Sequence, residues 1–285
     1  MKIAVLTDSG TGFTQKEAQD LGLYYVPLQV LHNDTQYLDG INIDVRKVYD
    51  LMKEKQELTT SMPPLAFIEK TIAQMKEDGC DCVICVPISN GLSSTASIIT
   101  AAVQAADMKL FVVDCYSTAY IQRYLAESAK KLVDQGLAAK TIVKRLEDAI
   151  HSSNTLIIPD DLQHLKRGGR LTPVAAALGG LLKIKPVLQL NKQSDGKIDV
   201  FDKVRTMSKA IQKAIDTFVY EDVGENYRMA CLHADVEDMG KQFLTDLTTA
   251  LPNRSVIFGM IAPVIAVHTG IGCLGIQYIK EVEGV

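Results

Sequence analysis

The 285-residue sequence contains no tryptophan, and aromatic residues make up only 6% of it. Proteins that bind single-stranded nucleic acid stack the bases on aromatic side chains, so this composition argues against such a role. The chain also lacks an excess of positive charge, because its formal net charge at pH 7 is -4. Nucleic-acid-binding domains are typically basic, and we therefore expect no nucleic-acid partner.

The sequence also lacks a long hydrophobic run. The longest apolar stretch, residues 256–267, contains Pro263 and falls short of the roughly 20 residues that a membrane-spanning helix needs. The short apolar run near the N-terminus is not followed by a signal-peptide cleavage site. We therefore expect a cytoplasmic protein whose six cysteines are reduced thiols.

Motifs for metals and cofactors are missing too. Residues 80–85 contain three cysteines, but this segment resembles an apolar strand, in which alternate side chains face opposite ways. No second Cys or Cys/His pair has zinc-ligand spacing. The turn at residues 10–12 lacks the third glycine of the dinucleotide fingerprint, and no phosphate-binding loop ends in Gly-Lys-Ser/Thr. We therefore expect neither a metal nor a cofactor.

Short apolar runs alternate with helical patterns in the first half of the chain. Strands are predicted at residues 3–7, 24–31, 82–87 and 110–113. Helices are predicted at residues 14–21, 45–55, 63–76, 95–106, 118–135 and 138–150. This alternation predicts a three-layer α/β/α domain with a mostly parallel sheet.

The pattern changes after residue 151. Strands are predicted at residues 155–159, 186–190, 198–202, 228–233, 256–259, 263–268 and 274–280. Helices are predicted at residues 162–166, 206–220 and 236–250. This order indicates an α+β domain with a mixed sheet, so the expected domains are 1–151 and 152–285.

Three loops of the first half are rich in hydroxyl groups, at residues 7–12, 59–64 and 89–95. They follow predicted strands or precede helices, and ligands bind open α/β sheets at that edge. Helix N-termini present free N–H groups that suit a carboxylate or a phosphate. The plainer interpretation is that these serines and threonines are helix N-caps.

Two further segments carry groups that bind anions. His268 lies at the end of a predicted strand, beside glycines that let the backbone approach a ligand closely. The alternative is a hydrogen-bonded structural histidine. Arg167 and Arg170 flank a Gly-Gly turn, and arginine binds carboxylate and phosphate well, although a solvated turn is the alternative.

An acyl hydrolase is one competing hypothesis, in which Ser93 and His268 form a nucleophile–base pair. No carboxylate is clearly placed to orient this histidine, and Thr95 occupies the second glycine position of a nucleophile elbow. A binding module for another small anionic metabolite is a further competing hypothesis.

Five short motifs, taken together and in order, resemble those of one family. They are residues 3–9 (Ile-Ala-Val-Leu-Thr-Asp-Ser), 60–63 (Thr-Ser-Met-Pro), 88–95 (Ile-Ser-Asn-Gly-Leu-Ser-Ser-Thr), 165–170 (Leu-Lys-Arg-Gly-Gly-Arg) and 268–272 (His-Thr-Gly-Ile-Gly). The sequence is similar to the DegV family, the fatty-acid-binding B subunits of bacterial fatty acid kinase. Each motif is weak alone, but the ordered set spans nearly the whole chain.

The resemblance implies a carrier that performs no chemistry of its own. A long-chain fatty acid would lie between the two domains, with its carboxylate bound by Thr60 or Ser61, by Ser93 with Ser94 beside it, and by His268. The acyl chain would enter an apolar tunnel in the second domain, for which the candidates are residues 174–182, Phe258, Met260 and Ile261.

The resemblance also implies a partner. An ATP-dependent fatty acid kinase subunit would phosphorylate the bound carboxylate, and Arg170 and Arg205 would lie near the head-group opening or dock that partner. We also expect transient membrane contact. The chain departs from the family pattern at Met62 (for glutamine), Ser94 (for glycine) and Ile271 (for proline), which removes no proposed carboxylate ligand but could shift the chain preference.

Overall fold

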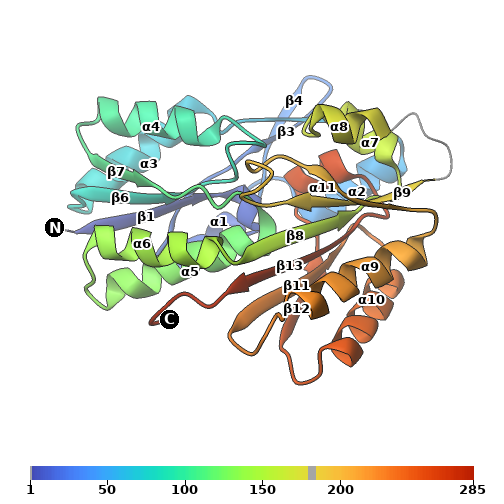
Figure 1. Cartoon of the computed structure of the whole chain (residues 1–285). Helices are drawn as coiled ribbons and strands as arrows, with labels where there is room; N and C mark the ends of the chain where they lie inside the picture. Colours follow the sequence, from blue (N-terminus) through green and yellow to red (C-terminus); the bar gives the residue numbers. More distant parts are fainter. Residues whose placement is uncertain (1, 179–183) are drawn as a thin grey trace.

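The computed structural model describes residues 2–178 and 184–285, and its described strands form three sheets (Figure 1). The first sheet is parallel and has the order β2-β1-β6-β7. Its strands are β1 (Ile3–Asp8), β2 (Tyr24–Val26), β6 (Cys82–Val86) and β7 (Lys109–Val112).

Helices cover both faces of this parallel sheet. The helices α3 (Leu65–Glu77) and α4 (Thr95–Ala105) pack on one face. The helices α1 (Gln15–Asp20), α5 (Ala119–Asp134) and α6 (Ala139–Ile150) pack on the other. All five residues of β6 are buried, as expected for a strand between two layers of helices. The predicted three-layer α/β/α arrangement is confirmed.

The second sheet is mixed and has six strands in the order β10-β9-β8-β13-β11-β12, as predicted for the second half. The strands are β8 (Ser153–Ile158), β9 (Lys185–Leu190), β10 (Asp199–Val204), β11 (Tyr227–His233), β12 (Val256–Met260) and β13 (Leu274–Lys280). One face packs against α9 (Met207–Tyr220) and α10 (Glu237–Ala250). The other face packs against α2 (Val45–Lys53), α7 (Leu162–Arg167), α8 (Pro173–Ala177) and α11 (Pro263–Thr269).

The third sheet was not predicted. It joins β4 (Thr35–Leu38), β3 (Gln29–His32) and β5 (Leu58–Ser61) in an antiparallel arrangement. The single strand predicted at residues 24–31 is wrong, because the chain breaks around Pro27 and its two halves join different sheets. Proline has no N–H for a strand ladder, which explains the break. The loop predicted at residues 59–64 is also partly wrong, since its first part belongs to β5.

The strand predicted at residues 263–268 is wrong as well, because this segment forms the helix α11. Pro263 occupies the first turn of the helix, where a missing N–H is tolerated. The helix packs against both the three-stranded and the six-stranded sheets. His268 therefore lies in the last turn of a helix and not at a strand end.

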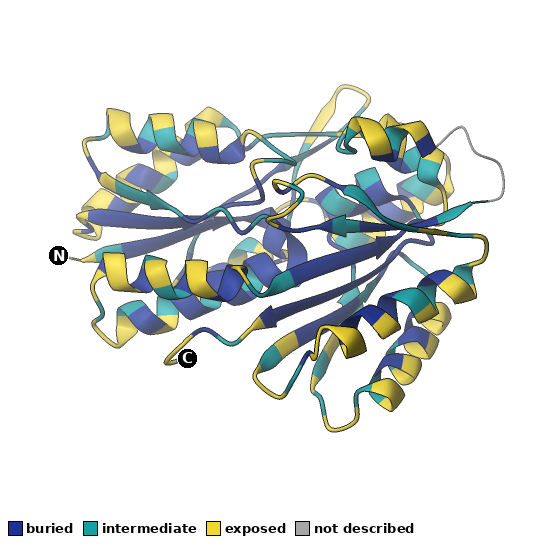
Figure 2. Ribbon diagram, viewed as in Figure 1, coloured by how far each residue is buried: buried dark blue, intermediate teal, exposed yellow. Residues whose placement is uncertain are grey.

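The interior strands of both larger sheets are largely buried (Figure 2), and polar bonds link the six-stranded sheet to the segment before α5, a helix that packs on the parallel sheet. Gln277 of β13 donates hydrogen bonds to Thr155 Oγ1 (2.8 Å) and to the carbonyl of Thr118 (3.0 Å). After β13 the chain returns to α6, where Arg145 donates to the carbonyl of Glu283 (3.0 Å).

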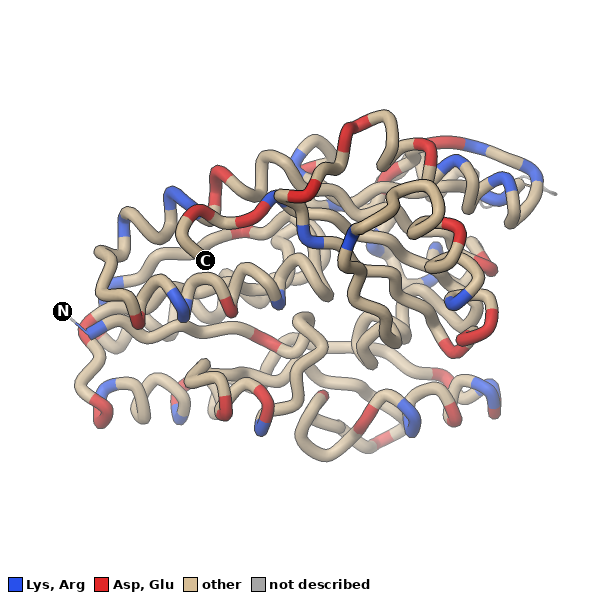
Figure 3. The backbone as a smooth tube through the Cα atoms, turned by 90° about the horizontal axis from the view of Figure 1, so that it is seen from below, with Lys and Arg blue, Asp and Glu red and all other residues tan. Residues whose placement is uncertain are grey.

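Charged residues of both signs alternate along the outer helices and loops (Figure 3). No helix in the described part of the chain is long and apolar enough to cross a bilayer.

Candidate ligand-binding site

A pocket of about 460 Å³ lies where the three sheets meet. Its walls come from β5, from the loop between β6 and α4, from α11 and from the six-stranded sheet. Small-molecule sites usually enclose roughly 300–1,000 Å³, so the size suits one ligand of moderate length.

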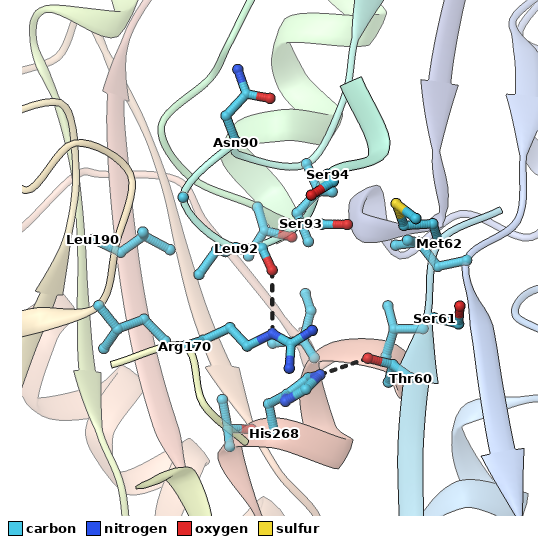
Figure 4. Close-up of a pocket in the computed structure, with 18 of the residues that line it drawn as sticks. Thr60, Ser61, Met62, Asn90, Leu92, Ser93, Ser94, Arg170, Leu190 and His268 are labelled. Atoms are coloured by element: carbon cyan, nitrogen blue, oxygen red, sulfur yellow. Dashed lines mark hydrogen bonds between the residues drawn. The ribbon is translucent and has the colours of Figure 1, made fainter. Parts of the chain in front are cut away.

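Thr60 and His268 form one end of this pocket. Thr60 lies on β5, and its Oγ1 is 2.7 Å from His268 Nε2 at the C-terminal end of α11 (Figure 4). Ser61 also lines the pocket, but in Figure 4 its hydroxyl points away from His268. Successive side chains of a strand face opposite sides, which explains the difference. Thr60 is therefore the better placed of the two alternatives for a ligand held by His268.

His268 is neutral at physiological pH. Burial lowers the pKa of its imidazole to about 4, and the nearby charges of Arg170 and His164 contribute. A neutral imidazole has one N–H donor and one acceptor, so it can form a hydrogen bond to a carboxylate without carrying a charge. Gly168 makes room for the ring, because a Cβ at this position would lie 2.7 Å from His268 Nδ1.

Arg170 supplies the positive charge of the pocket. Its Nη1 donates to the carbonyl of Gly168 (2.6 Å) and its Nε donates to the carbonyl of Leu92 (3.3 Å), as Figure 4 shows for the second bond. These bonds hold the side chain between the Gly-Gly turn and the loop before α4. Guanidinium has five N–H donors, so others remain for an anion. Among the described lining residues, Arg170 is the only one with a formal charge at neutral pH.

The loop before α4 brings Ser93 and Ser94 to the same pocket. Ser93 Oγ lies 2.8 Å from Thr95 Oγ1, and its backbone N–H donates to the carbonyl of Ser89. Ser94 occupies the N-cap position of α4, but its side chain makes no capping hydrogen bond. In this first turn the N–H of Thr95 donates to Ser93 Oγ (3.3 Å) and the N–H of Ser97 donates to the carbonyl of Ser94 (3.1 Å), so the Ser94 hydroxyl is the group that could bind an anion here.

The hydroxyl of Ser93 and the imidazole of His268 do not form a nucleophile–base pair. In the described structure each has another partner, Thr95 for Ser93 and Thr60 for His268. The side chains whose charges shift the pKa of His268 include no carboxylate; the largest such effect comes from Arg170. This arrangement lacks the acid that orients the base in a catalytic triad.

Apolar side chains form most of the remaining wall of the pocket, together with the polar residues Asn90, Thr118 and Thr269. Ile157, Leu190 and Ile198 come from the six-stranded sheet and its connections, and Val264 and Ile265 come from α11. The predicted tunnel residues Phe258, Met260 and Ile261 do not line it: Met260 and Ile261 pack in the core beside α11, and Phe258 stacks on His233. Val174 is largely exposed. Residues 179–182 of the predicted segment lie outside the described residues.

A second cavity of about 670 Å³ lies on the other side of the Thr60–His268 contact. Thr60, Arg170 and His268 line both cavities, and Gly168 lies beside His268 in the second; we call these four residues the head-group wall. Lys55, His164 and Arg167 also line the second cavity, as do the acidic residues Glu57 and Asp161. Arg205 is exposed and lines neither cavity.

Two of the three predicted hydroxyl loops thus meet at the pocket, and the third does not. The loop at residues 7–12 lies behind the pocket wall, where Asp8 accepts a hydrogen bond from the N–H of Ile88. Thr118 also lines the pocket and was missed, although its position as the first residue of the predicted helix 118–135 was a signal.

The fold and the site define an α/β protein with an amphiphilic pocket between its sheets. A sequence profile described as "Uncharacterised protein, DegV family" matches residues 2–281. Protein DegV from Bacillus subtilis is 33% identical over 285 residues, covering 97% of this chain and 98% of that protein. The chain belongs to the DegV family.

Solved structures of the family share the whole fold. A fatty acid binding DegV family protein from Streptococcus agalactiae matches with a TM-score of 0.89 at 27% identity, covering 99% of both chains. The structure of DegV from Bacillus subtilis, described as a fatty acid binding protein, matches with a TM-score of 0.87 at 30% identity, covering 99% of this chain and 100% of that one.

Proposed function

We propose that this chain binds one long-chain fatty acid in the 460 Å³ pocket. The observation that carries the proposal is the amphiphilic lining: Arg170, the neutral His268 and several hydroxyls share one pocket with apolar side chains of the six-stranded sheet and α11. A single-tailed monoanion matches this distribution. Relatives at 27% and 30% identity are described as fatty acid binding.

In the proposed complex the carboxylate lies against the head-group wall. Thr60, Ser93 and His268 would donate or share hydrogen bonds, with Ser61 and Ser94 at the margin and Arg170 as the counter-charge. A buried carboxylate that lacked such partners would become protonated, so these groups are needed to keep it charged. Domain 1–151 would contribute the hydroxyl loops, and domain 152–285 would enclose most of the chain.

Burial of the tail is sufficient for tight binding. Each methylene group contributes about 0.8 kcal/mol, so a chain of about fourteen would contribute on the order of 11 kcal/mol before entropy losses. The apolar side chains Ile157, Leu190 and Ile198 would receive the part of the tail nearest the head group.

The second cavity supports the further proposal that the chain presents its ligand to a kinase. Because the head-group wall borders both cavities, a carboxylate bound there would be accessible from the side away from the tail. An ATP-dependent kinase subunit could then phosphorylate it, with Arg205 on the exposed surface contributing to docking. In this proposal the chain is a carrier without its own cofactor or catalytic group.

The binding proposal is tested by native mass spectrometry of the purified protein, followed by denaturation and lipid identification. We expect one fatty acid per chain. A matched comparison of palmitate with hexadecanol, which has the same tail and no carboxylate, should show much weaker binding of the alcohol. A protein that is purified empty and ignores palmitate and oleate would reject fatty-acid binding and favour the small-anion hypothesis.

The kinase proposal has a separate test. Purified kinase, ATP and fatty acid should form acyl phosphate only when this chain is added, and Arg205→Glu should lower the rate without changing fatty-acid affinity. If the ligand binds but no kinase modifies it, the carrier role stands and the presentation role does not.

A further inference from the structure

Asp8 is a buried carboxylate behind the pocket. Its side chain is fully buried at the end of β1. In the described ranges 2–178 and 184–285, no ion pair involves it. Isolated buried carboxylates are costly unless hydrogen bonds satisfy them. The hydrogen bonds that satisfy Asp8 connect it to residues of the pocket wall.

One oxygen of Asp8 holds the start of the Ser93 loop. Asp8 Oδ2 accepts from the backbone N–H of Ile88 at 2.7 Å. Ile88 lines the pocket, and from it the chain leaves β6 and runs to Ser93. Hydrogen bonds to an ionised acceptor are shorter and roughly twice as strong as neutral ones, so this bond is a firm anchor for the loop.

The other oxygen of Asp8 is connected to Thr118 through hydrogen bonds of Gly10. Asp8 Oδ1 accepts from the N–H of Gly10 (2.8 Å) and from Gln122 Nε2 (3.0 Å). Thr118, which lines the pocket, donates to the carbonyl of Gly10 at 3.0 Å. The arrangement has no spare room, because a Cβ at Gly10 would lie 2.5 Å from Gln122 Oε1 and 2.9 Å from Asp8 Oδ1.

We propose that Asp8 is a positioning residue of the head-group site: its ionised carboxylate fixes Ile88 and Thr118 in the pocket wall, so that ligand affinity depends on the charge of Asp8. The inference rests on the proposed fatty-acid binding. It concerns a residue that does not touch the ligand and lies outside both cavities.

Protonation would break this arrangement in a specific way. A protonated carboxyl group is a weaker acceptor than a carboxylate, and its O–H hydrogen competes for the space around the oxygen that carries it. The bond from Ile88, or those from Gly10 and Gln122, would then weaken. Burial raises the pKa of Asp8 to about 6, against the opposing effect of the bonds from Gln122, Ile88 and Gly10. The change of charge thus falls within a range accessible to binding experiments.

The titratable groups around Asp8 come from several elements. They are Tyr25 on β2, Asp39 after β4, Cys85 on β6 and Cys115 after β7. The helix α5 contributes Gln122, which does not titrate, while Arg123 lies over the ring of Phe13 and pairs with Glu127. Asp39 changes charge in a similar range, because burial raises its pKa to about 7. The experiment must therefore isolate Asp8.

The test compares wild type with Asp8→Asn, using palmitate dissociation constants measured between about pH 5 and pH 8. The ratio of the two constants at each pH largely cancels the protonation of the ligand, and repeating both measurements in an Asp39→Asn background removes the charge of Asp39. At the alkaline end we expect roughly tenfold weaker binding by the variant. Near pH 5 the ratio should approach one, because wild-type Asp8 is then neutral as well. A pH-independent ratio, or equal affinity at the alkaline end, would overturn the inference.

Two further variants complete the design. Gln122→Met removes a bond that lowers the pKa of Asp8, so the midpoint of the pH dependence in an otherwise wild-type chain should move to higher pH. An unmoved midpoint would contradict the inference even if Asp8→Asn does not fold. Asp44→Asn is the matched control, since exposed Asp44 accepts a backbone N–H at the start of α2, and its pH profile should equal wild type.

The outcomes also separate the two proposals. If wild-type protein binds palmitate but the ratio of the two dissociation constants does not change with pH, only the role of Asp8 is rejected, and the proposed function stands. Wild-type protein that binds no fatty acid at any pH rejects the proposed function, and the positioning role falls with it.

Discussion

Thr60 and His268 are 208 positions apart in the sequence, yet the Oγ1 atom of one lies 2.7 Å from the Nε2 atom of the other. This contact joins the three-stranded sheet to α11 and closes the wall between the two cavities. Both groups are suited to binding a carboxylate, and a ligand that entered here would bond to them in place of, or together with, their mutual bond.

Replacing Thr60 with valine keeps the shape of the side chain and removes its hydroxyl. We expect palmitate affinity to fall by about 1–3 kcal/mol, because a buried hydrogen-bond partner is lost. Isothermal titration calorimetry on folded protein would measure it. Ser61→Ala is the control and should change affinity little, since the Ser61 hydroxyl points away from His268. The reverse result would transfer the carboxylate contact to Ser61.

Gly168→Ala should displace the His268 ring. The backbone of Gly168 is right-handed helical, so alanine fits its φ and ψ, but the new Cβ would lie 2.7 Å from His268 Nδ1. We expect a stability loss of about 1–3 kcal/mol from overpacking and at least several-fold weaker palmitate binding.

The adjacent glycine provides the control for this clash. Gly169 has φ +73°, and a Cβ added to it would meet no group of the described structure within 4 Å, so Gly169→Ala introduces backbone strain alone. It should lower the unfolding free energy by about 1 kcal/mol and leave palmitate affinity unchanged. Equal affinity losses in both variants would show that turn geometry, and not the His268 contact, is responsible.

His268 should also contribute a pH dependence to stability. Its pKa is lowered from 6.5 to about 4 in the folded protein, mainly by burial. The unfolded chain therefore binds the proton more tightly, and this contribution is full above about pH 6.5 and is lost as the pH falls through 4. Between about pH 4 and pH 6.5, His268→Gln should reduce the slope of the unfolding free energy against pH by up to roughly 1.4 kcal/mol per pH unit in the ligand-free protein. Parallel profiles from urea unfolding would contradict the burial of a neutral histidine.

Ser93 should not react as a nucleophile. Its Oγ is bonded to Thr95, and His268 is bonded to Thr60. After incubation with an activated ester such as p-nitrophenyl palmitate, intact-mass analysis should show no acyl adduct. Ser93→Ala should still weaken palmitate binding by about 1–3 kcal/mol. A Ser93 adduct that forms and hydrolyses would support the acyl hydrolase instead.

The long periodic elements could be predicted from the sequence because their patterns are local. The apolar strand β6 and the helices α4, α5 and α6 follow directly from runs of buried residues and from helical spacing. The alternation of strands and helices was enough to predict a parallel sheet with helices on both faces. These predictions needed no knowledge of which distant segments meet.

The short elements could not be predicted in the same way. The segment from Pro263 to His268 is apolar and rich in β-branched residues, which favours a strand locally, but packing between two sheets makes it a helix. Pro27 was a visible signal that residues 24–31 do not form one strand. The choice between Thr60 and Ser61 depended on β5 pairing with β3, a contact that no local pattern contains.

The head-group wall is only one layer of side chains thick, with a cavity on each side. A ligand bound there could either dissociate or have its carboxylate modified, and the two processes would be independent. Departure requires a route for the whole tail and the loss of its apolar contacts, so it is slow. Access to the carboxylate requires only an approach through the second cavity, so it can be fast. Residence time and reactivity of the bound acid would then be set by different residues, and a substitution in the apolar wall could change one while leaving the other untouched.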